Sequence, residues 1–358
     1  RADRSPASIK GHDESEEKEM SKWKRFIALG LSAMMMSAAL TGCSSTDSST
    51  AEGGESADAG KTLTLCLSTR DEWLSTLADA AIAEGEALGY EVIVQDCQND
   101  VNKQLQYVET VRNSGAEVVI VNLVNYELAQ EVIDAAGDMS VVFVNRMPTD
   151  PSLMDANHVY VGSDEGEAGY LQSEYLANYF KEKGQTDVSY ILLSGDLGMP
   201  STIKRTEYAI QGLKDAGLNA TAATADLVCE WSREVAVDRL APVLTQGVEF
   251  DCIIANNDAM ALGAVEALEA AGIDPASIPI VGIDATVDAL EAIESGTMAM
   301  SAFQNADGQG SNAVRAAVNL IEGKPFNEGG DFELAADNEF AMYVPFEAVT
   351  RDNVADYQ

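Results

Sequence analysis

The sequence predicts an α/β protein with two similar lobes, each a parallel sheet covered by helices. Apolar runs of strand length alternate with segments of helical periodicity, which is typical of βαβ units. The alternation restarts after Val159–Gly162, so the chain holds two successive blocks of the same rhythm. With 358 residues, of which 46% are hydrophobic, the chain is long enough to build two hydrophobic cores.

The first block is expected to alternate strands and helices from Thr62 onward. Its strands are the apolar runs Thr62–Ser68, Glu91–Gln95, Glu117–Leu123 and Val141–Val144. Its helices are Trp73–Leu88, Asn99–Ser114 and Glu127–Ala136. In the first helix Trp73, Leu77 and Ala81 lie near one face, and Gly89 is suited to end it.

The second block continues the alternation. Its strands or extended segments are Val159–Gly162, Val188–Leu193, Ala220–Val228, Cys252–Ala255, Pro279–Ile283, Ala299–Phe303 and Ala341–Pro345. Its helices are Ala168–Lys183, Ile203–Ala216, Arg233–Thr245, one that follows Asp258, Val287–Ser295 and Gly308–Glu322. Gly323 and Pro325 are suited to end the last helix.

A polar turn, Asn256-Asn257-Asp258, follows the strand Cys252–Ala255. It leads into a helix with apolar residues at positions 260, 262, 265 and 268. Such a turn lies at the carboxyl edge of a parallel sheet, where open α/β folds bind ligands. Asn257 and Asp258 are therefore suited to cap the helix, to contact a ligand, or to do both.

Composition excludes several classes of function. The formal net charge of −37 argues against nucleic acid, because a protein that binds phosphates must neutralise them. The two histidines, His12 and His158, are too few for a His-rich metal site and argue against a Ser-His-Asp triad. Cys66, Cys97, Cys229 and Cys252 are expected to be buried free thiols, with a Cys66–Cys97 bridge left open.

The N-terminal segment predicts secretion. After polar residues 1–19, Met20 precedes a short basic stretch, and Phe26–Leu40 is an apolar run of signal-peptide length. The run ends in Leu-Thr-Gly-Cys43, which resembles the lipobox of bacterial lipoproteins. This implies an acylated Cys43 that anchors the protein to the cell membrane; the alternative is a buried cysteine after a signal anchor. Residues 44–60 are expected to form a flexible linker.

The segment ANNDAMALGAVEAL at 255–268 closely resembles the galactose/glucose-binding proteins, within the periplasmic sugar-binding family of ABC transporters. The resemblance implies two Rossmann-like lobes of the type I periplasmic binding protein, with three hinge crossings and the ligand in the cleft. The crossings are expected near Val161–Ser163, Gln304–Asp307 and Ala336–Glu339. The lobes would comprise residues 61–161 with 305–337, and 162–304 with 338–358.

A sugar requires planar polar side chains for its hydroxyls and aromatic rings for its faces. The resemblance assigns these roles to residues near the ends of strands, namely Asp71, Trp73, Asn145, Arg146, Met199, Arg205, Trp231, Asn257, Asp284 and Gln304. Met199 and Ser201 replace a His and an Asp of the galactose/glucose type. The other interpretations are an N-cap for Asp71, core packing for Trp73 and Trp231, and a solvated loop side chain for Arg146.

The family resemblance implies a non-enzymatic protein that closes around one monosaccharide and delivers it to an ABC permease. Asn145 favours a hexose, whereas Gln304 and Arg146 favour a pentose, and the replacements at 199 and 201 leave room for an inositol or a deoxy sugar. We expect a monomer with no cofactor, and no calcium, because segment 182–187 is too short for a calcium loop.

Three other functions remain from the sequence. The first is a sensor lipoprotein that signals to a chemoreceptor or kinase. The second is a repressor of the same fold, which the secretion signal argues against. The third is an enzyme that uses Asp71, Asp258 or Asp284 as acid or base.

Overall fold

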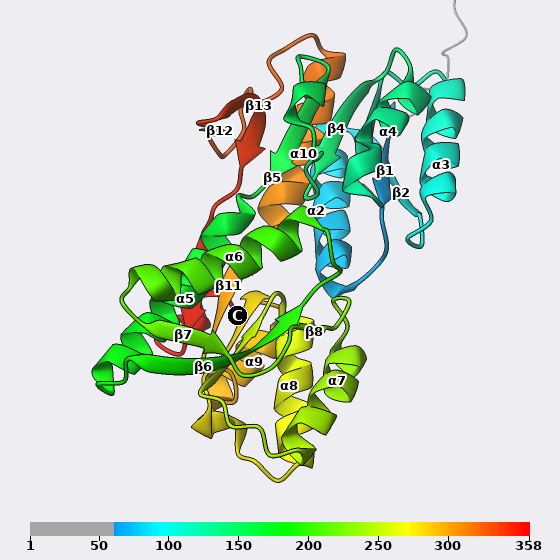
Figure 1. Ribbon diagram of the computed structural model, residues 1–358. Coiled ribbons are helices and arrows are strands. Elements are labelled where there is room, and N and C mark those ends of the chain that lie inside the picture. Colours follow the sequence, from blue (N-terminus) through cyan, green and yellow to red (C-terminus); the bar gives the residue numbers. More distant parts are fainter. Residues whose placement is uncertain (1–60) are drawn as a thin grey trace, which may run out of the picture. The chain divides into compact units, whose positions relative to one another are not determined.

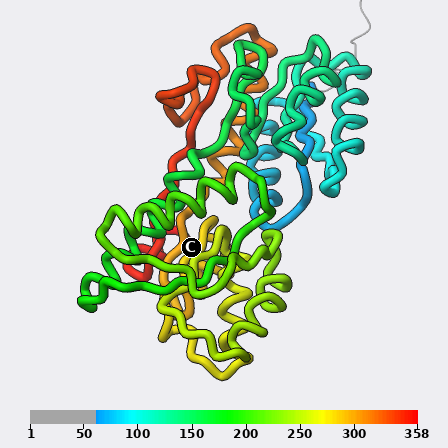
Figure 2. The backbone as a smooth tube through the Cα atoms, viewed as in Figure 1, coloured from blue at the N-terminus to red at the C-terminus, as the bar shows by residue number. Residues whose placement is uncertain are grey.

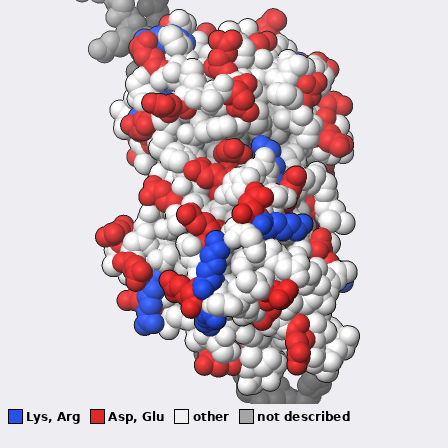
Figure 3. Space-filling model, turned by 60° about the vertical axis from the view of Figure 1, so that its left-hand side comes forward, with Lys and Arg blue, Asp and Glu red and all other residues white. Residues whose placement is uncertain are grey.

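The computed structural model describes residues 61–358, which form two α/β lobes, each built on a seven-stranded sheet (Figure 1). The predictions for the signal segment, Cys43, His12 and the 44–60 linker lie outside the described residues. Among residues 61–358, no helix is both long and apolar enough to span a bilayer. Figure 3 shows acidic side chains spread over the visible face of both lobes, in keeping with the net charge.

The first sheet has the strand order β12-β13-β5-β4-β3-β1-β2. Its strands are β1 (Lys61–Leu67), β2 (Tyr90–Asp96), β3 (Val118–Val121), β4 (Ser140–Val144), β5 (His158–Gly162), β12 (Leu334–Ala335) and β13 (Asn338–Tyr343). Its helices are α2 (Glu72–Leu88), α3 (Val101–Asn113), α4 (Ala129–Ala136) and α10 (Ala306–Ile321), with short 3₁₀ turns η1 (Tyr126–Leu128) and η2 (Pro151–Leu153).

The second sheet has the order β14-β11-β10-β9-β6-β7, with β8 also paired to β6. Its strands are β6 (Asp187–Ser194), β7 (Asn219–Ala222), β8 (Leu227–Val228), β9 (Cys252–Ala255), β10 (Ile280–Asp284), β11 (Met300–Gln304) and β14 (Phe346–Thr350). Its helices are α5 (Glu165–Glu182), α6 (Pro200–Asp215), α7 (Arg233–Thr245), α8 (Asp258–Ala270) and α9 (Val287–Ser295), with η3 (Pro275–Ser277) and η4 (Val354–Asp356).

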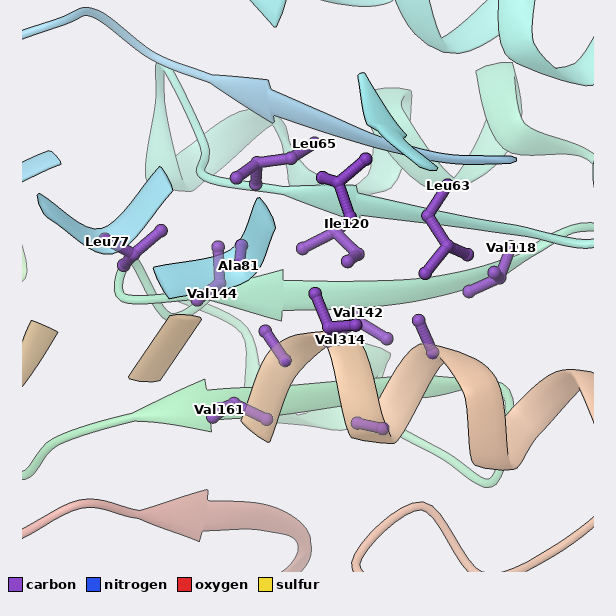
Figure 4. Close-up of a cluster of buried hydrophobic side chains, with 14 of the residues drawn as sticks. Leu63, Leu65, Leu77, Ala81, Val118, Ile120, Val142, Val144, Val161 and Val314 are labelled. Atoms are coloured by element: carbon purple, nitrogen blue, oxygen red, sulfur yellow. The ribbon is translucent and has the colours of Figure 1, made fainter. Parts of the chain in front are cut away.

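The central strands of each sheet are buried on both faces, so strands such as β3 and β9 are apolar throughout. In β3, Val118 and Ile120 pack under α2 and α10, whereas Val119 and Val121 face α3 and α4. Figure 4 shows the first of these layers, in which Leu63, Leu65 and Val314 meet between the strands and α10. The parallel βαβ units bring the carboxyl ends of the strands to one edge of each sheet.

Glycines allow close helix pairing in both lobes. A Cβ on Gly169 of α5 would lie 2.5 Å from the carbonyl oxygen of Arg205 in α6. Gly263 of α8 meets the Arg233 carbonyl of α7, and Gly310 of α10 meets the Leu77 carbonyl of α2 in the same way. The backbone of α6, which carries Arg205, is therefore positioned directly by a glycine of α5.

The structure corrects two expectations. The sheets are mixed rather than wholly parallel, because β14 runs antiparallel to β11 and β12 antiparallel to β13. The third crossing lies at residues 344–345, not near Ala336–Glu339, because β13 pairs with β5 of the first sheet. Figure 2 shows this C-terminal segment passing from one lobe to the other. Sequence pattern missed the crossing because only Val344 and Pro345 separate two strands that belong to different sheets.

The other two passages between the sheets lie around Ser163–Asp164 and Asn305, between β5 and α5 and between β11 and α10. Cys66, Cys97, Cys229 and Cys252 are all buried and free in the structure.

Candidate functional site

A cavity of about 500 Å³ lies between the two lobes. All ten predicted site residues line it, together with residues that the sequence did not assign to the site. The predicted ones are Asp71, Trp73, Asn145, Arg146, Met199, Arg205, Trp231, Asn257, Asp284 and Gln304. The additional ones include Thr69, Asn99, Tyr126, Glu165, Asp196, Ser201 and Glu230. The structure thus brings together side chains that are up to 235 positions apart in the chain, from Thr69 to Gln304.

The turns around the cavity hold unusual backbone conformations. Seven non-glycine residues among those described have a positive φ, and five of them line the cavity, namely Asn99, Asn145, Glu230, Trp231 and Asp284. Such conformations cost free energy and cluster at functional sites. At Asn145, with φ 63°, the turn is held by the Tyr160 hydroxyl, which donates to the Asn145 carbonyl at 2.7 Å.

Arg205 is the central cation of the site and is 4% exposed. Its Nε donates to Glu165 Oε2 at 2.6 Å, and one terminal nitrogen donates to the Asn256 carbonyl at 2.8 Å. The other terminal nitrogen donates to Gln304 Oε1 at 3.3 Å. The nitrogen that bonds the Asn256 carbonyl also lies 3.9 Å from Asp284 Oδ1. Burial acts to lower the pKa of Arg205, but the Glu165 and Asp284 carboxylates raise it, so the guanidinium stays charged.

Asp284 is the last residue of β10 and is held in the least favourable conformation of the set, with φ 120°. Burial raises the pKa of its carboxyl group well above the ordinary value, although Arg205 acts in the opposite direction. The neighbouring carboxylates Asp258, Asp71 and Glu165 raise it further. The site therefore disfavours negative charge at Asp284.

Both predicted aromatic residues lie at the cavity rather than only in the cores. Trp73 is the second residue of α2, and its Nε1 donates to the Gln304 carbonyl at 3.0 Å. Trp231 comes from the turn before α7, and the guanidinium carbon of Arg205 is 5.7 Å from its ring centroid. Aromatic surfaces from both lobes are therefore available to the faces of a flat, apolar-faced ring.

Two residues that are predicted to contact the ligand cap helices, which confirms the capping interpretation and leaves the ligand contact a prediction. Asp71 accepts the Leu74 backbone N–H of α2 at 2.7 Å, and Asn257 accepts the Met260 N–H of α8 at 3.0 Å. Each cap uses one oxygen, and both side chains still line the cavity. The caps fix the rotamers of Asp71 and Asn257 before any ligand arrives.

Arg146 is half-buried and ordered, contrary to the interpretation of a solvated loop side chain. One terminal nitrogen donates to the Leu123 carbonyl at 2.9 Å, and the guanidinium carbon lies 5.6 Å from the centroid of the Tyr126 ring. Neighbouring Asn145 accepts a hydrogen bond from Asn122 at 3.1 Å. Hydrogen bonds thus join the residues that follow β3 to those that follow β4.

Sequence reasoning missed Tyr126 and Glu165. Tyr126 lies in η1, and its buried hydroxyl is 3.3 Å from Ser201 Oγ of the other lobe, so the two lobes touch here. Glu165 lies in the first turn of α5, where an acidic residue is common for reasons of helix stability alone. Neither directly follows a strand, and the family resemblance assigned no role to either, so no signal in the sequence placed them at the site.

Gln304 ends β11 at the second crossing and is 3% exposed. Its carboxamide oxygen is used by Arg205, but its Nε2 has no hydrogen-bond partner. A buried donor without a partner costs about 1–3 kcal/mol unless a ligand or water accepts from it.

Among residues 61–358, no group of three or more His, Cys, Asp or Glu side chains is placed to hold a metal ion.

Comparisons with known proteins agree with this architecture. The family model for the periplasmic binding protein domain matches residues 64–325. A candidate rhizopine-binding protein of Rhizobium meliloti is 32% identical over 75% of this chain and 83% of its own length. A D-galactose/methyl-galactoside binding periplasmic protein of Haemophilus influenzae is 29% identical over 80% of this chain and 88% of its own length.

Solved structures share the fold. An ABC transporter solute binding protein from Bacillus halodurans, with bound myo-inositol, superposes with a TM-score of 0.71 at 30% identity. The match covers 84% of this chain and 99% of that chain. A protein from Actinobacillus succinogenes with bound D-allose also reaches a TM-score of 0.71, at 21% identity, over 83% of this chain and all of that one.

Proposed function

Because this chain belongs to the periplasmic binding protein domain family, we propose that it is the sugar-binding component of an ABC importer. In this proposal the cavity captures one monosaccharide or cyclic polyol, and the closed form delivers it to a membrane permease. Membership in the family implies a location outside the cytoplasm. The finer proposal is a lipoprotein anchored through an acylated Cys43 and working as a monomer.

The observation that carries the proposal is the convergence of planar polar groups and tryptophans from both lobes on one cavity. Asp284, Asn145 and Gln304 present carboxylate or amide groups that pair with neighbouring hydroxyls. Trp73 and Trp231 present ring faces to the C–H surfaces of a sugar. The residues have no proposed catalytic role, because binding and release need no bond to be made or broken.

Closure follows from how the site is divided. Asp71, Trp73, Asn145 and Arg146 belong to the first lobe, whereas Arg205, Trp231 and Asp284 belong to the second. A ligand that touches both groups gains contacts only when the lobes approach, so it favours the closed state by that difference in contacts. The permease can then distinguish loaded from empty protein by shape.

We propose a narrower class of ligand than sugars in general. The relatives and solved structures are described as binding rhizopine, galactose, myo-inositol and D-allose. Met199 and Ser201, which line the cavity, are less polar than the His and Asp expected for a galactose/glucose site. We favour a six-membered ring polyol, of the hexose or inositol class, over a pentose, because the solved structure that is 30% identical to this chain holds myo-inositol.

A thermal-shift screen followed by titration calorimetry tests the proposal. The panel contains D-galactose, D-glucose, D-ribose, D-allose and myo-inositol, with amino-substituted counterparts of the hexoses and of inositol. At least one member is expected to bind with a micromolar or lower dissociation constant, about −8 kcal/mol or tighter. If no member shifts the melting temperature or releases heat, the proposal fails.

A sensing role is the second candidate, since the same closed form is equally readable by a receptor domain. A binding assay with the purified permease separates the two functions. Loaded protein that stimulates ATP hydrolysis by the permease supports import, and loaded protein that leaves it unchanged supports sensing.

A further inference from the structure

The cavity carries an excess of negative charge. Five carboxylates line it, from Asp71, Glu165, Asp196, Glu230 and Asp284, against two guanidinium groups, from Arg146 and Arg205. At full ionisation this leaves a formal excess of three negative charges. A neutral polyol hydrogen-bonds to such groups but offsets none of this charge.

The guanidinium groups of Arg205 and Arg146 differ in the carboxylates that surround them. Arg205 is engaged by Glu165 and lies near Asp284, so this trio accounts for one of the excess charges. Arg146 is the cation whose charge acts on Asp196 and on Asp71, and one of its nitrogens donates to the Leu123 carbonyl. Asp196 and Asp71 therefore share one guanidinium, and Glu230 adds a third carboxylate at the same cavity.

The cost of this arrangement is visible in Asp196. Burial raises the pKa of its carboxyl group, and the nearby Glu230 carboxylate raises it further, against opposite effects of Arg146 and of the Trp231 side chain. Closure of the lobes removes water and increases the cost of every charge without a partner. Either the carboxylates take up protons on closure, or the ligand brings a positive charge.

A second observation points to a ligand at this place. Gln304 Nε2 is buried at the cavity without a partner, so the site is incomplete until something accepts from it. Trp231, with φ 62°, directly follows Glu230, with φ 54°, and both residues line the cavity. Two consecutive left-handed residues cost free energy, and a carboxylate and an aromatic ring at one cavity suit an ammonium group attached to an apolar-faced ring.

We infer that the preferred ligand is a polyol ring bearing an ammonium group, such as an amino sugar or an amino-substituted cyclitol, received by Asp196 and Glu230. This inference rests on the proposed function and names its substrate class. The hydroxyls of the ring remain with Arg205, Asp284, Asn145 and Gln304, and the ammonium replaces the missing cation between the lobes.

Titration calorimetry with matched pairs of ligands tests the inference. The pairs are D-glucose with D-glucosamine, D-galactose with D-galactosamine, and myo-inositol with an amino-deoxy derivative of myo-inositol. In at least one pair the amine is expected to bind at least about 10-fold tighter than the neutral polyol. Asp196→Asn and Glu230→Gln should each remove most of that advantage, whereas Glu109→Gln, which alters an exposed carboxylate of α3, should leave it intact.

Each other outcome is decisive. If a neutral polyol binds as tightly as its amine, and takes up protons when titrated in buffers of different ionisation enthalpy, the inference is wrong and the proposed function stands. If the amine is preferred equally in both carboxylate variants, the assignment to Asp196 and Glu230 is wrong. If no member of any pair binds, the proposed function fails together with the inference.

Discussion

Arg205 Nε of α6 lies 2.6 Å from Glu165 Oε2 of α5, and both side chains are almost closed off from solvent. The pair joins the two helices that Gly169 allows to approach closely, and it also forms part of the cavity wall. A buried guanidinium needs such a partner, because desolvation of an unpaired charge costs several kcal/mol. One ion pair therefore serves both the stability of the second lobe and the shape of the site.

Replacement of Glu165 should reveal this double role. Glu165→Ala leaves the Arg205 guanidinium buried with Asp284 as its nearest remaining carboxylate, at 3.9 Å. We expect a loss of about 3–5 kcal/mol in the free energy of unfolding, measured by urea denaturation without ligand. The control is Glu266→Ala, which breaks an exposed pair with Arg233 and should cost less than about 1 kcal/mol. Similar costs for the two variants would contradict the structural role.

Trp231 should matter for binding much more than for folding. Its ring lines the cavity and lies against Arg205, so Trp231→Ala removes one stacking surface from the site. We expect affinity for the best ligand of the panel to fall about 10- to 100-fold, or about 1.4–2.8 kcal/mol, by calorimetry. Circular dichroism of the ligand-free variant should match the parent. An unchanged affinity would place the ligand elsewhere.

The helix pairing through Gly169 predicts an unusual substitution result. In the interior of a helix, alanine is normally more favourable than glycine by about 1 kcal/mol. In Gly169→Ala, however, the new Cβ would meet the carbonyl oxygen of Arg205 and the backbone nitrogen of Ala209, neither of which can rotate away. We expect a net loss of about 1–3 kcal/mol in urea denaturation and weaker ligand binding through displacement of α6. Asn178→Ala on the exposed face of α5 should change stability by less than about 0.5 kcal/mol.

Much of the fold was predictable because the central strands of each sheet are buried on both faces. Apolar runs such as Cys252–Ala255 predict a strand from their own residues alone. Gly89 ends α2 in the left-handed conformation that favours glycine, with φ 79°. Start positions were less certain. Helix α6 begins at Pro200 rather than Ile203, because proline suits the first helical position and apolar periodicity does not register it.

The site was predictable where a residue ends or follows a strand, as Asp284 and Asn145 do, and where a family motif covers it, as with Arg205. Tyr126 and Glu165 escaped because neither directly follows a strand, and Asp196 and Glu230, two residues after β6 and β8, escaped because the family resemblance assigned them no role. How the lobes face each other is set by the crossings, and the last of these, at Val344 and Pro345, has no signal in local periodicity. The charge balance of the cavity is therefore visible only in three dimensions.

The buried carboxyl group of Asp258 should make the stability of the protein depend on pH. Its carboxylate is fully buried and accepts hydrogen bonds from the Ser301 hydroxyl at 2.7 Å and from the Thr286 backbone N–H at 3.0 Å. Burial raises its pKa from 3.8 to about 7, although these two hydrogen bonds act to lower it. Because the folded state binds this proton more tightly than the unfolded state, the contribution of Asp258 to stability is complete below about pH 4 and is lost as the pH rises through about 7.

Asp258→Asn should remove that dependence, since the amide is similar in shape and carries no charge. We expect the difference in unfolding free energy between parent and variant to shift in favour of the variant as the pH rises from about 4 to about 7, with a slope of at most about 1.4 kcal/mol per pH unit. Above that range the difference should level off. Urea denaturation of both proteins across the range measures it, and Glu109→Gln provides the control for surface carboxylates. Parallel curves for parent and Asp258→Asn would mean that the buried carboxyl group titrates near its ordinary pKa, and that water or a rearrangement of the Ser301 hydroxyl and the Thr286 backbone N–H compensates its charge.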